Sequence, residues 1–295
     1  MPLKSKIAKK FIFPTSIFSM EVFKRLLLPI SSEFFSENVA ERAEKFVELF
    51  GSKVYAVYII EEKTLRKVDE IAEPFLTEKQ RKEMEKNIIE KNKGVANIIF
   101  EKIAEYIPDF EREIIVGEFS DVIMKKAKKH NATCVMMGFE KECFLRYRLL
   151  ENIKIPVWVE IGKGENVLGV CSNLAPNVRV PKFTLKFAEK FGKKAYFIYV
   201  IDTEEKIEVD EKGVKREKTM EELRQAAEKF AAKYKKYADV KIAVGSIEGE
   251  VAKYADEVNA DVVIIGREMK KRKIFSREIK KEMIEKIKHS LLFLN

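Results

Sequence analysis

Two fifteen-residue stretches of the sequence decide the fold, because they are copies of one helix–strand unit. Residues 46–60 read FVELFGSKVYAVYII and residues 187–201 read FAEKFGKKAYFIYVI, and eight of the fifteen positions are identical without a gap. In each stretch a glycine, Gly51 or Gly192, separates a helical pattern from a run of β-branched and aromatic residues. A glycine typically ends a helix and such a run typically forms a strand, so each copy predicts a helix followed by a strand.

A second pair of blocks extends the repeat towards the carboxyl end of each copy. Residues 114–138 match residues 242–266 with nine identities in 25 positions, including the pairs Gly117/Gly245 and Gly138/Gly266. The offset between the copies changes from 141 to 128, so the first copy carries 13 additional residues within the charged stretch 61–109. Self-similarity of this kind identifies a tandem duplication of one supersecondary unit.

Short apolar runs alternate with amphipathic helical stretches in both copies, which favours βαβ units and a parallel sheet buried on both faces. We therefore predict an α/β fold of two tandem five-stranded parallel doubly wound, Rossmann-like domains with pseudo-two-fold symmetry. The expected strands are Arg25–Ile30, Val54–Ile60, Glu111–Val116, Thr133–Met137 and Val157–Glu160 in the first copy, and Asn166–Cys171, Lys194–Ile201, Val240–Val244, Asp261–Ile265 and Leu291–Leu294 in the second.

Three helices are predicted from their apolar spacing. The first is Glu37–Phe50, which ends at Gly51. A long second helix carries apolar residues at helical spacing from Met84 to Ile107, with Gly94 as a candidate bend, and the last helix of the chain is expected over Ser276–Lys288.

The repeat boundaries predict an N-terminal extension over residues 1–22, a first domain over 23–162 and a second over 163–295, joined near Ile161–Glu165. Residues 1–20 place basic residues before an apolar stretch, as a signal peptide does, but Pro14 interrupts it and no small-residue cleavage site follows. We interpret the segment as an extension to the folded part and expect a cytoplasmic protein.

Composition excludes several classes of protein. Hydrophobic residues make up 46% of the chain and no run of 18 apolar residues occurs, which indicates a globular protein without a membrane span. Three cysteines and two histidines, with no C-x2-C pair, argue against a disulfide framework and against a metal site. The net charge of +9 is a modest excess that fits solvated helix faces, so nucleic-acid binding is not expected.

The sequence resembles the universal stress protein family in its tandem form. The resemblance rests on LLLPISS at 26–32 as the opening strand and turn, on VG at 116–117 with DVI at 121–123, and on ATCVMMG at 132–138 and ADVVIIG at 260–266 as the fourth strands. It implies two Rossmann-like domains, a regulatory role in stress responses, and in some members an adenine nucleotide such as AMP or ATP.

The residues that hold nucleotide in that family are only partly present. The family's aspartate after the first strand is replaced by Ser31 and Ser172, and both phosphate loops lack two of three glycines after Gly138 and Gly266. Glycines let backbone amides approach phosphate oxygens, so their loss weakens such a cradle. The second copy retains more, because several basic residues lie between Gly266 and Ser276 and could neutralise a phosphate, although a solvated polar loop is the alternative.

The candidate nucleotide-binding residues follow strand ends of both copies. They are Pro29, Ser31, Gly117 and Gly138 in the first copy, and Cys171, Ser172, Asn173, Ile201, Gly245, Gly266, Arg267, Lys271, Lys273 and Ser276 in the second. For Cys171–Asn173 the alternative is a turn that caps the next helix. No nucleophile with an adjacent base stands out, so we do not predict an enzyme, and weak hydrolysis of nucleotide is left open.

The terminal strands Val157–Glu160 and Leu291–Leu294 are apolar and need a partner, because open strand edges invite association. We expect the two domains to pair with each other within one chain, and the same argument allows a homodimer. Two functions are carried forward. The first is a stress-response regulatory protein that binds an adenine nucleotide, more readily in the second domain. The alternative is a structural module of the same fold that binds an unknown protein partner and no nucleotide.

Overall fold

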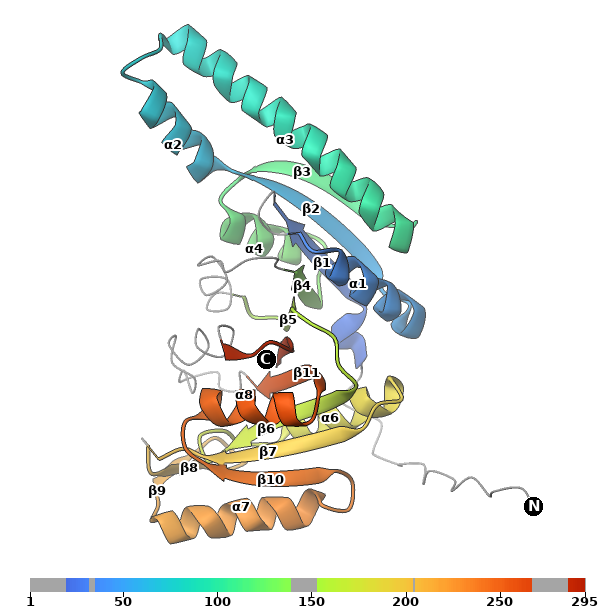
Figure 1. Cartoon of the computed structure of the whole chain (residues 1–295), viewed down its shortest axis with the longest axis vertical. Helices are drawn as coiled ribbons and strands as arrows, with labels where there is room; N and C mark the ends of the chain where they lie inside the picture. Colours follow the sequence, from blue (N-terminus) through green and yellow to red (C-terminus); the bar gives the residue numbers. More distant parts are fainter. Residues whose placement is uncertain (1–19, 32–34, 139–152, 204, 267–285, 295) are drawn as a thin grey trace, which may run out of the picture.

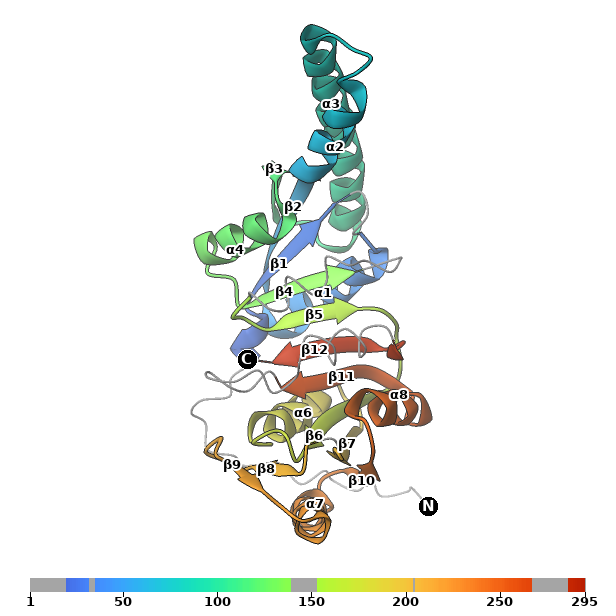
Figure 2. The same ribbon diagram turned by 90° about the vertical axis from the view of Figure 1, so that its left-hand side faces the viewer.

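The computed structural model describes residues 20–31, 35–138, 153–203, 205–266 and 286–294. Ten strands from these residues form one sheet in the order β10-β7-β6-β11-β12-β5-β4-β1-β2-β3. The strands of the first copy occupy one half of this sheet and those of the second copy occupy the other, and Figures 1 and 2 show the two halves stacked along the long axis of the molecule. The parallel α/β class predicted from the sequence is confirmed.

The first half contains β1 (Arg25–Ile30), α1 (Glu37–Phe50), β2 (Lys53–Glu61), α2 (Glu62–Ala72), α3 (Glu78–Tyr106), β3 (Glu111–Gly117), α4 (Phe119–Lys129), β4 (Cys134–Gly138) and β5 (Val157–Glu160), preceded by the 3-10 turn η1 (Met20–Phe23). The second half contains β6 (Asn166–Ser172), α6 (Arg179–Lys190), β7 (Ala195–Ile201), β8 (Ile207–Val209), β9 (Lys215–Glu217), α7 (Met220–Tyr234), β10 (Asp239–Val244), α8 (Ile247–Glu257), β11 (Ala260–Gly266) and β12 (Ser290–Leu294).

Within each half, all strand pairs of the ten-stranded sheet are parallel, and the two halves meet at one antiparallel pair, β5 with β12. Trp158 lies opposite Leu292 at the centre of this pair. The strand order is the same in both halves when it is read outwards from the junction, so a pseudo-two-fold axis relates them. An antiparallel junction also places the carboxyl ends of the strands of the two halves at opposite edges of the sheet.

Several local predictions coincide with the structure. The helix α1 has the predicted bounds, and Gly51 ends it with a φ of 60°, while the Gly51 N–H donates to the Val47 carbonyl at 2.8 Å. This left-handed conformation favours glycine, which explains why the repeat retains a glycine there. The helix predicted over 276–288 falls largely outside the described residues.

The long second helix predicted around Met84–Ile107 is present as α3, which passes through Gly94 as one helix and begins at a capping box of Thr77 and Gln80. Two other features were missed by the sequence patterns, and the first is the helix α2 between β2 and α3. The second half has a short antiparallel hairpin, β8 with β9, at the corresponding place in the chain. Of the described helices, none is long and apolar enough to cross a membrane.

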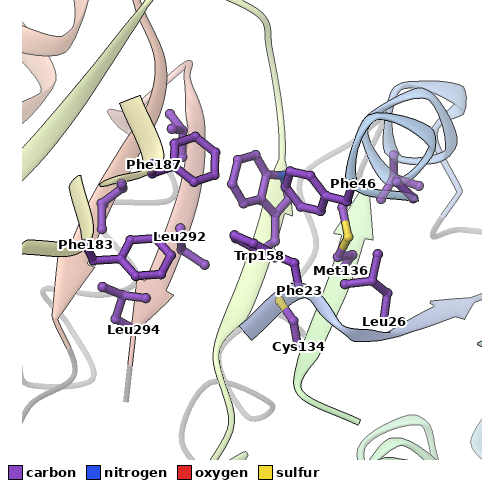
Figure 3. Packing of buried hydrophobic residues seen from close by; sticks show 14 of the residues in the cluster. Phe23, Leu26, Phe46, Cys134, Met136, Trp158, Phe183, Phe187, Leu292 and Leu294 are labelled. Carbon is purple, nitrogen blue, oxygen red and sulfur yellow. The ribbon is translucent and has the colours of Figure 1, made fainter. Parts of the chain in front are cut away.

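Aromatic side chains from both halves fill the junction. Trp158 of β5 is fully buried and lies 5.2 Å from the ring of Phe46 in α1 and 5.9 Å from that of Phe187 in α6. Phe23 of η1 contacts the same three rings, and Figure 3 shows the cluster between the two helices. Large aromatic surfaces dominate burial energetics, so this cluster holds the two halves together.

Candidate functional site

The candidate residues of the first half lie at one edge of the sheet, because parallel strands end on the same side. Pro29 belongs to β1, buried Ser31 follows it, Gly117 ends β3, and Gly138 ends β4. In doubly wound sheets this edge, near the point where the strand order reverses, is where ligands bind. The structure therefore brings these four residues to one face of the first half, as their positions in the repeat suggest.

Gly138 has a packing role that the sequence did not show. A Cβ atom at this position would lie 2.8 Å from the Cβ of Ser36 and 3.1 Å from the Cβ of Val39, so only glycine lets the start of α1 approach the end of β4. Ser36 is the N-cap residue of α1, and its side chain makes no capping hydrogen bond. The positive end of the α1 dipole thus faces the strand end where the sequence places a ligand.

The candidate residues of the second half gather in the same way at the opposite edge of the sheet. Cys171 and Ser172 end β6, Ile201 ends β7, Gly266 ends β11, and Gly245 follows β10. Gly245 has a φ of 150°, a conformation that side chains rarely adopt, and its N–H donates to the Ile201 carbonyl at 3.1 Å. The turn geometry accounts for this glycine.

Ser172 takes part in a turn that is satisfied by its own chain. The Ser172 Oγ accepts a hydrogen bond from the N–H of Leu174 at 3.1 Å, and the Ser172 N–H donates to Asn177 Oδ1 at 3.1 Å. Asn177 Nδ2 in turn donates to the carbonyls of Ser172 and Ala175, at 2.7 Å and 2.8 Å. These bonds form a turn before α6, as the alternative for this segment has it, but none of them caps the helix, whose N-cap residue is Val178.

Asn173 is fully buried and ties the β8–β9 hairpin to the end of β6. Its Nδ2 donates to the Ile207 carbonyl at 2.7 Å, and its Oδ1 accepts from the N–H of Asp202 at 2.7 Å. The N–H of Val209, which is itself buried, donates to the Asn173 carbonyl at 2.8 Å. The hairpin therefore occupies the space over the ends of β6 and β7, and Asn173 is committed to holding it there.

The basic loop predicted to neutralise a phosphate falls outside the described residues. Arg267, Lys271, Lys273 and Ser276 all belong to the stretch 267–285. Their part in ligand binding stays a prediction.

A buried network of charges at the junction was not found from the sequence. Arg42 of α1 reaches Glu160 at the end of β5 and Asp261 in β11, so it joins the two halves. Its Nε donates to Glu160 Oε2 at 3.1 Å, and its two Nη atoms donate to the carboxylate oxygens of Asp261 at 3.0 Å and 2.7 Å. All three side chains are buried, with exposed fractions of 4% for Arg42 and 1% for both acids.

Neighbouring groups complete this network. Trp158 Nε1 donates to Glu160 Oε2 at 2.6 Å, and the Arg42 guanidinium lies over the Trp158 ring at 5.2 Å. Lys193 Nζ lies 3.0 Å from Asp261 Oδ2 and donates to the carbonyl of Gly164 in the linker at 2.8 Å. Buried charges are tolerated only when they are paired and hydrogen-bonded in this way.

The pKa values of the network follow from burial and pairing. Burial alone acts to raise the pKa of Asp261, but its hydrogen bonds to Arg42 and Lys193 and their charges outweigh it, so the pKa is lowered. For Glu160 burial is the larger effect, and the pKa is raised. Burial acts to lower the pKa of Arg42, and the two carboxylates reverse this effect and raise it.

The network is present on one side of the pseudo-two-fold axis only. In the repeat alignment Arg42 corresponds to Phe183, Asp261 corresponds to Thr133, and Glu160 corresponds to Leu294 by its position beside the fourth strand. An arginine where the other copy has a phenylalanine on the buried face of an amphipathic helix was the one signal in the sequence that pointed to this site. Within the described parts of the chain, no group of three or more His, Cys, Asp or Glu side chains is arranged to hold a metal ion.

These features define a protein of two tandem doubly wound domains. The carboxyl ends of the strands, where the candidate ligand residues lie, are at opposite edges of one continuous sheet in the two domains. A family model described as the Universal stress protein family matches residues 23–159 and 172–276, which together make up most of the sequence. The chain belongs to the universal stress protein family. No curated protein sequence matches the chain.

Solved structures show the same architecture over nearly the whole chain. A universal stress protein from Archaeoglobus fulgidus DSM 4304 is 16% identical, with a TM-score of 0.62, over 92% of this chain and 97% of that one. A putative universal stress protein from Pseudomonas aeruginosa UCBPP-PA14 is 11% identical, with a TM-score of 0.59, over 93% and 94%. A functionally unknown protein from Pseudomonas aeruginosa PAO1 is 11% identical, with a TM-score of 0.60, over 93% of each chain. At these identities the likeness establishes the fold.

Proposed function

We propose that this protein is a cytoplasmic stress-response regulator that acts by binding and not by catalysis, and that it binds an adenine nucleotide at the strand ends of the first half. Membership of the universal stress protein family supports the regulatory role. The two halves differ at the carboxyl ends of their strands, and this difference supports placing the nucleotide in the first half. The edge of the second half is filled by the β8–β9 hairpin held by Asn173, whereas β2 of the first half continues directly into α2.

The start of α1 favours an anion at the edge of the first half. Ser36 leaves the first-turn amides of α1 without a side-chain cap, and Gly138 lets them lie close to the end of β4. Uncapped amides and the helix dipole attract a phosphate. The glycines missing after Gly138 reduce the number of backbone amides that can reach further phosphates, so we expect AMP to bind at least as well as ATP.

Thermal unfolding with nucleotides tests this proposal, because a ligand that binds only the native state raises the melting temperature. Saturation at about 100 times the dissociation constant adds roughly 2.7 kcal/mol of stability. We expect AMP to raise the melting temperature by several degrees, and ATP by no more than AMP.

A matched pair of N-cap variants assigns the site to one half. Ser36→Asp and Val178→Asp each place a carboxylate at the N-cap of the first helix of one half, a residue that caps helices well and repels phosphate. We expect Ser36→Asp to abolish the AMP-induced shift and Val178→Asp to retain it. The reverse result moves the site to the second half, as the sequence analysis expected.

The alternative function is a module that binds a protein partner and no nucleotide. The turn bonds of Ser172 and Asn173, which occupy their side chains with backbone groups, favour it for the second half. No thermal shift with AMP, ADP or ATP at millimolar concentration overturns the nucleotide proposal and leaves this alternative.

A further inference from the structure

The helical arm, defined as residues 62–106 with α2, α3 and the turn between them, extends beyond the sheet at the outer end of the first half (Figures 1 and 2). Its outer part has almost no core. In α3 the buried residues are Ala96, Ile99, Phe100 and Ile103, all in the part of the helix that covers the sheet, and in α2 only Leu65 is buried. Ile88 and Ile89 are partly buried against the core, and none of residues 66–87 is buried. Helices in proteins are stabilised chiefly by packing of an apolar face, so residues 66–87 form the part of the arm that lacks such packing.

Apolar side chains are exposed on this arm. Phe75, in the turn between the helices, is 82% exposed, and Ile71 near the end of α2 is 72% exposed. Further along, Met84 and Ile88 line a shallow hollow of about 360 Å³ on α3, and Ile98 is 58% exposed. Gln80, Glu83, Asn87 and Lys91 also line this hollow, whose surface is mostly apolar. Exposed apolar side chains on the same arm as such a hollow are typical of a contact surface.

The charge of the arm favours a second copy of the chain over a strongly charged partner. Residues 62–106 contain ten Lys or Arg and ten Asp or Glu, so the arm is neutral and the remainder of the chain carries the whole net charge of +9. Two copies of the chain therefore repel each other through most of their surface and not through the arm. A strongly acidic partner or an anionic membrane would be attracted to the remainder of the chain and not to this neutral segment.

The spacing of the two apolar features suits a two-fold contact. Phe75 lies in the turn before α3, which begins at Glu78, and the hollow at Met84 and Ile88 lies 6 to 10 residues, or roughly 9–15 Å, further along this helix. A two-fold axis midway between them brings Phe75 of each copy to the hollow of the other, so that each contact is made twice. Four helices, two from each arm, then enclose the core that each arm lacks.

We propose that the helical arm is a dimerisation surface, and that two copies of the chain associate through it as an antiparallel four-helix bundle with Phe75 seated at Met84 and Ile88 of the other copy. This contact is separate from the β5–β12 junction, which is made within one chain. The proposal does not depend on nucleotide binding, because Phe75 and the hollow lie towards the outer end of the arm, whereas only the start of α2 meets the strand ends, directly after β2.

The test is sedimentation equilibrium or light scattering of the full chain between about 1 and 500 μM. A contact limited to the outer arm is expected to be weak, so the fraction of dimer should depend on concentration. We expect the wild-type chain to pass from monomer to dimer within this range. Phe75→Glu combined with Ile71→Glu introduces repelling charges at exposed positions and is expected to weaken the dimer at least about 30-fold. Circular dichroism checks that the helices remain.

Val214→Glu is the matched control, because Val214 is an exposed apolar residue of the second half, at 48%. We expect it to leave the dimerisation constant unchanged. Cysteines introduced as Phe75→Cys and Met84→Cys provide a second measurement, since a short bifunctional thiol reagent should link the two positions between chains. The buried Cys134 and Cys171 are protected from such reagents, and Cys143, which lies outside the described residues, is replaced by serine in both variants.

Three results overturn the proposal. One is a wild-type chain that stays monomeric at every concentration. Another is a dimer whose affinity is unchanged by the double glutamate variant, which places the contact elsewhere. The third is a monomer that binds neutral lipid vesicles only when Phe75 is intact, which makes a membrane surface and not a second copy the occupant.

Discussion

The two halves of this protein have the same arrangement of sheet strands and differ in the segments that connect those strands. Each half has five parallel strands in the same order, and each reaches its fourth strand through an asparagine in the left-handed region, Asn131 or Asn259, both with a φ of 48°. Between the second and third strands, however, the first half carries the helical arm and the second carries the β8–β9 hairpin and α7. The core of a duplicated domain constrains its sequence, whereas a connection at its outer edge is free to acquire a new structure.

The junction shows a second difference, in chemistry and not in shape. The aromatic rings are nearly symmetric, with Phe46 and Phe187 at equivalent positions against Trp158. The ionic network is not, because Arg42 and Asp261 correspond to Phe183 and Thr133. Paired charges are therefore buried on one side of the junction, whereas an apolar side chain takes the place of the arginine on the other side.

Among the variants considered, Arg42→Met is expected to have the largest effect on stability, and it tests the difference between the two sides of the junction. The side chain keeps most of its volume but leaves Glu160 and Asp261 buried without their cation, so we expect a loss of about 3–5 kcal/mol in the free energy of unfolding. The matched change Phe183→Met in the second half keeps an apolar side chain of similar size, and is expected to cost less than about 1.5 kcal/mol. Denaturant unfolding measures both.

A triple variant checks that the charges and not the site itself cause this loss. Arg42→Phe with Glu160→Leu and Asp261→Thr copies the residues of the other half, and we expect its stability to lie within about 2 kcal/mol of the wild type, because apolar replacement of buried ion pairs is often neutral or stabilising. Equal stability of Arg42→Met and Phe183→Met would contradict the assignment.

The two asparagines provide a smaller and symmetric effect. Asn131→Ala and Asn259→Ala each place a residue with a Cβ, and without the local hydrogen bonding of asparagine, at a φ of 48°, and each is expected to cost about 1 kcal/mol. Asn→Gly at the same positions should be close to neutral. Thermal and denaturant unfolding of the four variants measures these losses of stability in both halves. Losses that differ between the halves by more than about 1 kcal/mol would show that the shared turn is not equally constrained.

The smallest effect concerns pH. The hydrogen bond and charge of Lys126 lower the pKa of Glu113, whose model-peptide value is 4.5. Their ion pair therefore adds stability above about pH 4.5, and this stability is lost as the pH falls through the lowered pKa. Because Glu113 is 41% exposed, we expect a contribution of only a few tenths of a kcal/mol.

Lys126→Met should flatten the acid limb of the stability profile by that small amount. The corresponding pair in the second half is Lys241 and Tyr254, in which the ammonium lies 4.6 Å from the ring centroid. Tyr254→Phe is therefore the control, since a phenol does not titrate below pH 6 and the acid limb should be unchanged. An unchanged limb in Lys126→Met would show that the Glu113 pair contributes nothing measurable.

The predicted parts of the fold are those that depend on local patterns. The strand Arg25–Ile30 and the helix Glu37–Phe50 have the bounds predicted, because a continuous apolar run indicates a strand buried on both faces and a 3.6-residue apolar period indicates a helix buried on one face. The repeat also located the strand ends where candidate ligand residues gather. The hairpin β8–β9 was missed because three-residue strands are too short to show a period.

The candidate site was harder to predict than the fold. Ser172 and Asn173 look like ligand-binding residues by position, but their hydrogen bonds go to backbone groups of Leu174, Asp202 and Ile207. Gly138 looks like part of a phosphate loop, and in the structure its absent side chain also makes room for α1. The position of a residue in the sequence indicates where it lies along a strand. It does not show which groups form hydrogen bonds with its polar atoms.

The sequence by itself determined that one α/β unit occurs twice, where its strands and principal helices lie, and that its phosphate loops have lost glycines. The first two follow from periodicity and internal repetition, which are properties of the order of residues in the chain, and the third is what the resemblance to the universal stress protein family implies. Only the tertiary structure decided that Arg42 meets Asp261 across 219 positions, that Asn173 holds the β8–β9 hairpin at the end of β6, and that the outer part of the arm has almost no core. These depend on contacts between distant segments, and packing and desolvation act on the assembled side chains and not on their order in the chain.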